Sequence, residues 1–249
     1  DIRKLDLLMN TVGELGTVHG ALKAVLETLD EQTDLRKLFG ELRRIDRDLK
    51  QCLGDVQGNV LEARMVPLGL FFNKIARVVR QVARENLKDV RLVVTGSETE
   101  VDKLIAEELA DPLMHIVRNA IDHGIESPQE RKAAGKPASG TLAINAYHRG
   151  NQVIIEVEDD GRGIDPARLR EQALTRDLVP KRTLAEMTPE QLLQIIFIPG
   201  LSTAERVTDL SGRGVGMDVV KTNVSRLGRA VELQSDLGVS TKVSLTVPI

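Results

Sequence analysis

The stretch Ser211-Gly212-Arg213-Gly214-Val215-Gly216-Met217-Asp218-Val219-Val220-Lys221 places three glycines on alternate positions directly before an apolar segment. This segment is predicted to be a helix, so backbone N–H groups converge where the helix begins. Such groups and the positive end of the helix dipole favour a phosphate, and glycines let it approach closely. Gly214 and Gly216 are the candidates for the close contact. Glycine runs are also common in surface turns, so the interpretation depends on the rest of the chain.

Length, composition and charge narrow the class of protein. The chain has 249 residues with 41% hydrophobic content, enough for a folded core in one large domain or two small ones. A formal net charge of -3 argues against a nucleic-acid binder, which needs clustered positive charge. A single Cys excludes an internal disulfide, so a reducing compartment is expected.

Neither membrane insertion nor secretion is expected. No apolar run approaches the roughly 20 residues of a membrane span, and the start of the chain lacks the apolar core of a signal peptide. We therefore expect a cytoplasmic protein. The missing initiator Met and the strand-like end suggest a fragment of a longer protein.

The N-terminal part carries two apolar seams with three-then-four spacing, which is typical of paired helices. The seams consist of Leu5, Leu8, Val12, Leu15, His19, Leu22, Leu26 and Leu29, and of Leu35, Leu38, Leu42, Ile45, Leu49, Cys52 and Val56. A polar stretch at residues 30–34 separates them, so we expect an antiparallel hairpin. Each arm offers a narrow stripe, and a second copy is expected to complete a four-helix bundle. The alternative is packing on the rest of the same chain.

The heptads end at Arg64-Met65-Val66-Pro67, where Pro67 disfavours a helical conformation at the preceding residue. We therefore predict a helical-hairpin dimerisation domain at residues 1–64 and a second domain at residues 65–249. His19 is interpreted as a seam residue rather than a phosphate acceptor, because Gly20 and not an acidic residue follows it. Cys52 is interpreted as a small core residue.

In the second domain, a helix with one apolar and one polar face is predicted from about residue 101 to 123. At about 100° per residue, His115, Asn119 and Asp122 fall in one sector. An amide oxygen from Asn119 suits Mg²⁺, which takes few protein ligands when phosphates supply the rest. His115, one turn earlier, can orient or deprotonate an attacking group near the metal. The alternative is a solvated helix face, which more typically carries Lys and Glu.

A strand predicted at residues 152–158 runs into Asp159-Asp160-Gly161-Arg162-Gly163-Ile164. A carboxylate at a strand end, followed by glycines that let a ligand approach, can accept a hydrogen bond from an adenine amino group. A calcium-like loop or a simple turn is the alternative. Residues 198–205 lie between this turn and the glycine run, where a lid is predicted.

The order of elements predicts an α+β protein. The helical hairpin is followed by strands at residues 90–95, 140–148, 152–158, 230–235 and 240–247, with helices between them. This order predicts a mixed sheet with helices on one face, an α/β sandwich.

Four segments, taken together and in order, resemble the N, G1, F and G2 boxes of CheA-type chemotaxis histidine kinases. They are residues 115–126, 159–164, 199–203 and 212–218. That family belongs to the gyrase, heat-shock chaperone, histidine kinase and MutL mismatch-repair ATPase superfamily, which has a left-handed βαβ sandwich of the Bergerat type. Residues 5–63 resemble the dimerisation domain of the same kinases, so the resemblance covers nearly the whole chain.

The resemblance implies ATP and Mg²⁺ as cofactors and gives individual residues roles. Asn119 would bind Mg²⁺, with His115 beside it near the γ-phosphate, which makes both residues catalytic and metal-site candidates. Asp159 would meet the adenine amino group. The other residues implied for the nucleotide site are Asp122, His123, Gly161, Gly163, Ile164, Ser202, Thr203, Gly212, Arg213, Gly214, Val215, Gly216, Met217 and Thr241. Ser240 precedes Thr241 where the family usually has Gly.

The resemblance also implies the core of an ATP-dependent protein-histidine kinase in a bacterial two-component system. Its substrate would be a histidine on a separate phosphoacceptor domain, which is absent from this sequence. The expected partners are a second copy through the hairpin, and an adaptor protein, a chemoreceptor and response regulators through parts absent here. No nucleic acid and no direct membrane insertion are expected.

Two other functions stay open. One is an ATP-hydrolysing conformational clamp of the same superfamily, and the other is a nucleotide-binding dimer scaffold without chemistry. The clamps normally carry a Glu beside the N-box Asn to activate water, whereas Arg118 precedes Asn119 here.

Overall fold

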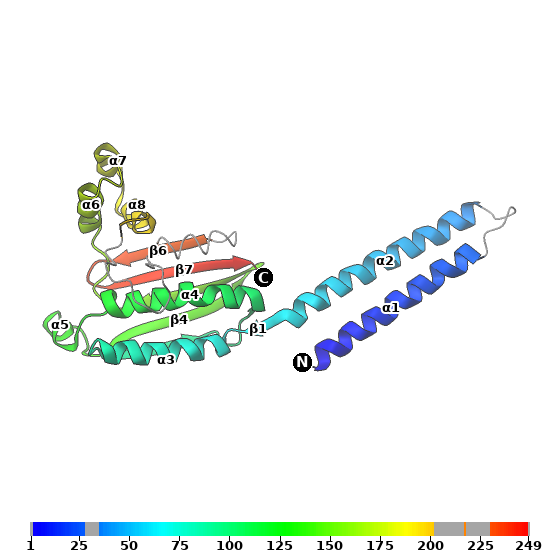
Figure 1. Ribbon diagram of the computed structural model, residues 1–249, viewed down its shortest axis with the longest axis horizontal. Coiled ribbons are helices and arrows are strands. Elements are labelled where there is room, and N and C mark those ends of the chain that lie inside the picture. Colours follow the sequence, from blue (N-terminus) through cyan, green and yellow to red (C-terminus); the bar gives the residue numbers. More distant parts are fainter. Residues whose placement is uncertain (1, 28–34, 202–216, 218–229, 249) are drawn as a thin grey trace. The chain divides into compact units, whose positions relative to one another are not determined.

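The computed structural model describes residues 2–27, 35–201, 217 and 230–248. The chain divides into two compact units, residues 1–65 and 66–249. Figure 1 shows the first unit as a pair of long helices and the second as a sheet with helices packed on it. The α+β architecture predicted from the sequence is confirmed.

The first unit is an antiparallel hairpin of α1 (Ile2–Glu27) and α2 (Leu35–Arg64). Ile45 and Cys52 of α2 are buried, as is Thr11 of α1. The Asn59 side-chain amide donates to Thr11 Oγ1 at 2.7 Å. This polar contact fixes the register of the two helices along their axes, because a shift of either helix would leave a half-buried amide without its hydrogen-bond partner.

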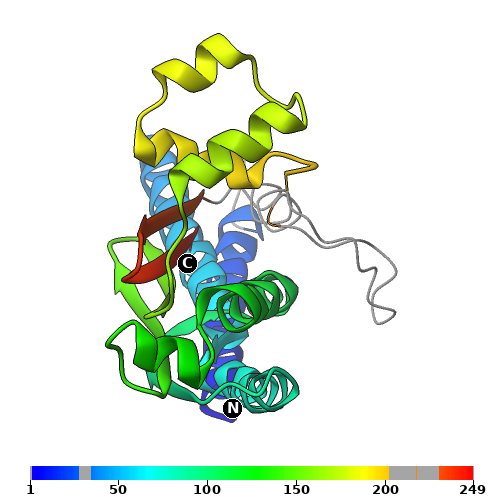
Figure 2. The same ribbon diagram turned by 90° about the vertical axis from the view of Figure 1, so that its left-hand side faces the viewer.

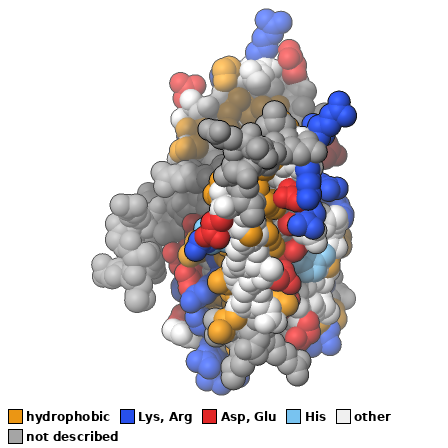
Figure 3. Space-filling model, turned by 90° about the vertical axis from the view of Figure 1, so that its right-hand side faces the viewer, with side chains coloured by type: hydrophobic (Ala, Val, Ile, Leu, Met, Phe, Trp, Pro, Cys, Tyr) orange, Lys and Arg blue, Asp and Glu red, His pale blue; other side chains and the backbone are white. Residues whose placement is uncertain are grey.

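The apolar stripe of the hairpin is wider than the contact between its two helices. Among the α1 side chains whose exposure the structure describes, those that lose exposure are Leu8, Thr11, Leu15, Val18, Ala21, Leu22 and Val25. Val12 and Leu26 remain 60% and 57% exposed, and His19 is exposed with them. These three positions face away from the contact between α1 and α2. The sequence predicts that a second copy covers the seam, and their exposure within a single chain leaves that prediction open. Figure 3 shows apolar side chains at the surface among charged ones.

The second unit contains a five-stranded mixed sheet in the order β2-β4-β5-β7-β6. Its strands are β2 (Val90–Thr95), β4 (Gly140–Arg149), β5 (Gln152–Asp159), β6 (Ala230–Asp236) and β7 (Ser240–Pro248). β2 runs parallel to β4, and the other neighbours are antiparallel. The short strands β1 (Met65–Pro67) and β3 (Glu100–Asp102) form a separate two-stranded sheet. The central strand β5 therefore ends in the middle of the main sheet.

Helices α3 (Gly69–Glu85) and α4 (Lys103–Asn119) lie side by side on one face of the main sheet (Figures 1 and 2). Phe72, Ile75 and Val79 of α3 are buried against it. Phe71 and Val78 are half-buried and pack against the same core. The core is mainly aliphatic, in line with an aromatic content of 2%, and Phe72 and Phe197 are its buried aromatic residues.

The segment after β5 forms α6 (Pro166–Thr175), α7 (Lys181–Glu186), α8 (Pro189–Gln194) and the 3-10 turn η2 (Ile195–Phe197). The three helices are short, and α7 lies in a stretch of mostly polar residues. Leu184, at 1% exposure, is the buried residue of α7. One buried side chain in a short helix gives no periodic signal in the sequence.

The described helices include none that is both long and apolar enough to cross a membrane.

Candidate functional site

Asp159 ends the central strand β5 and is nearly fully buried, with 4% of its surface exposed. Its Oδ1 accepts a hydrogen bond from the Gly161 N–H at 3.0 Å, and no group in the described part of the chain donates to Oδ2. Burial raises the pKa of Asp159 to about 7, against the opposing effect of the Gly161 hydrogen bond. A buried carboxyl group with one oxygen fixed and the other without a donor suits a ligand that brings a hydrogen-bond donor.

Two glycines pack against this carboxyl group. A Cβ on Gly161 would lie 2.2 Å from the carbonyl oxygen of Gly124 and 2.7 Å from Asp159 Oδ1. A Cβ on Gly124 would lie 2.9 Å from Asp159 Oδ1. The Arg162 N–H donates to Gly124 O at 2.9 Å. The turn after β5 and the segment before α5 (Pro128–Ala133) therefore meet backbone to backbone, which only residues without a side chain allow.

The other side of this turn rests on the hairpin of β6 and β7. The Ile164 N–H donates to Ser235 Oγ at 2.8 Å. Gly163 has a φ of +66°, and a Cβ there would come within 2.3 Å of the hairpin backbone. The Gly238 N–H donates to Arg162 O at 2.7 Å. Residues 159–164 are thus held from both sides as a rigid frame around Asp159.

Thr241 lies directly opposite Asp159 in the pairing of β5 with β7. Its Oγ1 is 3.2 Å from Ser235 Oγ, and Ser235 Oγ donates to the carbonyl of Ser240 at 2.9 Å. Because a hydroxyl has one proton to donate, Ser235 accepts from Thr241 as well as from the turn. Ser240, which stands where a Gly was expected, contributes to this chain of hydrogen bonds through its backbone.

His115 and Asn119 lie one turn apart near the end of α4, with His115 Nε2 and Asn119 Nδ2 separated by 2.9 Å. Both side chains are half-buried. When the Asn119 amide N–H donates to the ring nitrogen, the amide oxygen is directed elsewhere and is available to a cation. The pair therefore provides an oxygen ligand whose orientation is set by a neighbouring imidazole.

A π-helical turn, η1 (Ala120–Gly124), connects this pair to Asp159. The Ile125 N–H closes it by donating to Ala120 O at 2.7 Å. Such turns are rare and often occur at functional sites. Because Gly124 at its end packs against Asp159, η1 joins the polar end of α4 to the frame around the carboxyl group.

Two residues after α3 anchor η1. Lys88 Nζ donates to the carbonyls of Ile121 and Asp122 at 2.6 and 2.8 Å, and Asn86 Nδ2 donates to Asp122 Oδ1 at 2.9 Å. Burial lowers the pKa of Lys88 despite the attraction of Asp122. His123, the next residue of η1, is exposed. Lys88 thus supplies donors to carbonyls at the irregular end of the helix.

Family models match both parts of the chain. A model described as histidine kinase-, DNA gyrase B-, and HSP90-like ATPase matches residues 108–249, which is more than half of the chain. A model described as the homodimeric domain of signal transducing histidine kinases matches residues 1–63. The chain belongs to the histidine kinase-, DNA gyrase B- and HSP90-like ATPase family.

Relatives align with this ATPase family member along its full length. Sensor histidine kinase CheAY of Helicobacter pylori is 42% identical over 249 residues, which are 100% of this chain and 31% of that protein. Chemotaxis protein CheA of Bacillus subtilis is 40% identical over 249 residues, 100% of this chain and 36% of that protein. The chain thus spans about a third of the length of these relatives. The resemblance to CheA-type kinases predicted from the sequence is confirmed.

A solved histidine kinase domain from Erythrobacter litoralis EL346 covers 94% of this chain and 95% of its own at 16% identity, with a TM-score of 0.42. A score this low supports no comparison of sites.

Part of the site predicted for this family member lies outside the residues that the structure describes. These residues are Ser202, Thr203, Gly212, Arg213, Gly214, Val215 and Gly216. The glycine cradle and the lid therefore stay predictions. Met217 is described and is buried in the apolar core, at 7% exposure.

The described residues of the predicted site form two groups. Asp159, Gly161, Gly163, Ile164 and Thr241 surround the end of β5. His115, Asn119, Asp122 and His123 follow one another along the end of α4 and η1.

Sequence reasoning missed several residues that build the site of this family member. They are Asn86, Lys88, Glu126, Arg131, Lys136 and Ser235. All are polar or charged residues of types that are common on solvated surfaces. Their spacing along the chain gives no sign that they converge on η1 and on the turn after β5.

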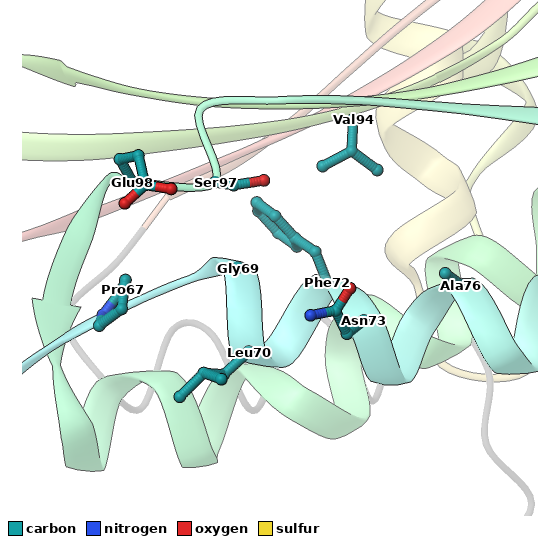
Figure 4. Close-up of a pocket in the computed structure, with 9 residues that line it drawn as sticks. All are labelled: Pro67, Gly69, Leu70, Phe72, Asn73, Ala76, Val94, Ser97 and Glu98. Atoms are coloured by element: carbon teal, nitrogen blue, oxygen red, sulfur yellow. The ribbon is translucent and has the colours of Figure 1, made fainter.

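A separate pocket of about 360 Å³ lies where α3 begins, and none of the residues predicted for the nucleotide site lines it. Its lining residues are Pro67, Gly69, Leu70, Phe72, Asn73, Ala76, Val94, Ser97 and Glu98. Figure 4 shows Phe72 projecting from α3 toward Ser97 and Val94, whereas Leu70 points away from them. This pocket is distinct from the frame around Asp159.

Proposed function

We propose that this chain is the ATP-binding and dimerisation core of a protein-histidine kinase in a bacterial chemotaxis system. The observation that carries the proposal is the buried Asp159 carboxyl group, which has one oxygen fixed by Gly161 and the other without a donor in the described residues. The ATPase family and the relatives named CheA support it.

Adenine is the base that this arrangement favours. Its exocyclic amino group would donate to Asp159 Oδ2, while guanine presents an acceptor oxygen at the corresponding place. The close packing at Gly124, Gly161 and Gly163 keeps the turn around Asp159 in place, since a side chain at any of them would displace its neighbours. The residues present therefore fit an adenine nucleotide.

The phosphates and the metal are assigned to the end of α4 and to the glycine run. Asn119 would hold Mg²⁺ through its amide oxygen, and the residues of η1 would face the phosphates. Mg²⁺, when bound, neutralises charge that develops on the transferred phosphoryl group. Gly212, Gly214 and Gly216 would grip the phosphates through backbone N–H groups.

The reaction proposed is transfer of the γ-phosphoryl group to an imidazole nitrogen of a histidine on a separate phosphoacceptor domain. Such a transfer depends mainly on positioning and on charge neutralisation. His115 would orient the incoming imidazole and, through its contact with Asn119, the metal ligand. Thr241 would support the adenine end through its place opposite Asp159.

The hairpin is proposed to dimerise with a second copy. Exposed apolar side chains on α1 and α2, among them Val12, Leu26, Phe39 and Leu53, offer a surface that a partner hairpin would cover. The match to the homodimeric domain of histidine kinases supports this assignment. An adaptor protein, a chemoreceptor and response regulators would act through further parts of a longer protein, as the length of the relatives suggests.

The test is to mix the protein with γ-labelled ATP, Mg²⁺ and a separate phosphoacceptor domain. We expect label on the acceptor histidine, and a strong loss of transfer in His115→Gln and Asn119→Ala. His148→Gln is the matched control, because His148 is exposed on β4. ATP hydrolysis without label on histidine would favour the conformational clamp, and nucleotide binding without either reaction would favour the scaffold.

A further inference from the structure

Arg131 is a buried cation that binds the turn after β5. It lies on α5, where a capping box of Ser127 and Glu130 starts the helix, and its side chain is 1% exposed. Its Nη2 donates to Asp160 Oδ2 at 3.0 Å, and its Nη1 donates to the carbonyl of Asp160 and to Glu126 Oε2, each at 3.1 Å. The guanidinium thus holds both the side chain and the backbone of Asp160.

Lys136 reaches the same turn from the loop after α5. Its Nζ donates to the carbonyls of Asp160 at 3.1 Å and Gly161 at 2.6 Å, and to Glu126 Oε1 at 3.0 Å. An ammonium group has three donors, and these three acceptors use them all. Burial by itself would raise the pKa of Glu126, but the hydrogen bond and charge of Lys136 outweigh it and lower that pKa. Glu126 is therefore an ionised bridge between the two cations.

The carbonyl that both cations bind belongs to the peptide group whose N–H reaches Asp159. In a trans peptide the C=O and the N–H point in opposite directions. Cations that fix the Asp160 carbonyl on one side therefore aim the Gly161 N–H to the other side, where it donates to Asp159 Oδ1 at 3.0 Å.

We propose that Lys136 and Arg131 are positioning residues for adenine recognition. They orient the peptide group between Asp160 and Gly161 so that its N–H occupies Asp159 Oδ1 and leaves Oδ2 for the base. This inference rests on the proposed function, because it takes Asp159 as the residue that meets the adenine amino group. Neither cation touches the nucleotide in this role.

Lys136 is the better residue to change. Removing Arg131 would take away a positive charge that offsets the negative charges of buried Glu126 and of Asp160. This loss would endanger the fold. The Lys136 side chain is 18% exposed, and Met keeps its apolar stem while removing the charge and the donors. Lys132→Met is the matched control, since Lys132 is an exposed lysine of α5.

The experiment compares binding of ATP with binding of inosine triphosphate, which carries an oxygen in place of the amino group. In Lys136→Met we expect ATP to bind about tenfold more weakly, because the hydrogen bond between Asp159 and the adenine amino group is misaligned. Binding of inosine triphosphate should change less than about twofold, since its base has no such amino group. In an Asp159→Asn background the same change should add little. In the nucleotide-free protein, the Gly161 amide proton resonance should shift upfield as its hydrogen bond weakens. Lys132→Met should match the parent in each measurement.

The outcomes separate this inference from the function on which it rests. Equal losses for both nucleotides in Lys136→Met, or an unmoved Gly161 resonance, would overturn the positioning role and leave ATP binding in place. A parent protein that binds ATP no better than inosine triphosphate would overturn the assignment of Asp159, and the positioning role with it.

Discussion

Replacing Asp159 by Asn should stabilise the nucleotide-free protein above neutral pH. The amide keeps an oxygen that can accept from the Gly161 N–H, but it removes a charge that is buried at 4% exposure. At alkaline pH the parent must carry a buried negative charge here, and no cation among the described residues forms an ion pair with it. The variant carries no charge at this position. The gain in the free energy of unfolding should therefore grow with pH.

The pKa of Asp159 sets the window and the size of this effect. The folded-state pKa is raised from 3.8 to about 7, so the folded state binds more protons than the unfolded state between these values. The stability that Asp159 contributes is thus fully present below about pH 4 and is lost as the pH rises through about 7. A rise of about 3 units corresponds to a loss of about 4 kcal/mol over the window, at about 1.4 kcal/mol per pH unit.

Urea unfolding at a series of pH values measures the difference between variant and parent. Tyr147 in β4 is the single Tyr of a chain without Trp, so its fluorescence reports on the second unit. Glu158→Gln is the matched control, because this neighbouring carboxylate on β5 is exposed. A difference between Asp159→Asn and the parent that stays constant within about 0.5 kcal/mol across the window would refute the reasoning.

Four further outcomes follow from the same contacts. ATP affinity of the parent should rise as the pH increases through about 7, because the adenine amino group prefers the ionised Asp159; a flat profile in calorimetry would count against this. Asp159→Asn should weaken ATP binding and flatten that profile. Gly161→Ala, whose Cβ would lie 2.2 Å from Gly124 O, should abolish detectable ATP binding and lower the free energy of unfolding by about 1–3 kcal/mol, and retained affinity would show that the frame can relax. Cys52 should react slowly with iodoacetamide at neutral pH until urea is added, because burial raises the pKa of its thiol; rapid alkylation of the folded protein would contradict it.

The sequence predicted those features that depend on local order. Three-then-four spacing indicated the two helices of the hairpin, and alternating residues between turn signals indicated the strands of the sheet. It did not show which seam residues meet within one hairpin: Val12 and Leu26 lie on the predicted seam but face away from the contact between α1 and α2. Periodicity shows that a stripe is apolar, but it does not show which part of a wide stripe meets which neighbour.

The candidate site divides in the same way. The sequence by itself determined the placement of Asp159 at the end of a strand, and of His115 and Asn119 one turn apart on a helix, because strand ends and helical turns are set within a few residues. Only the tertiary structure decided that Lys136 and Lys88 reach the site. Lys136 meets a carbonyl 25 residues away, and Lys88 meets one 33 residues away. Such contacts depend on strand register and on the path of the connecting loops, which no local pattern encodes.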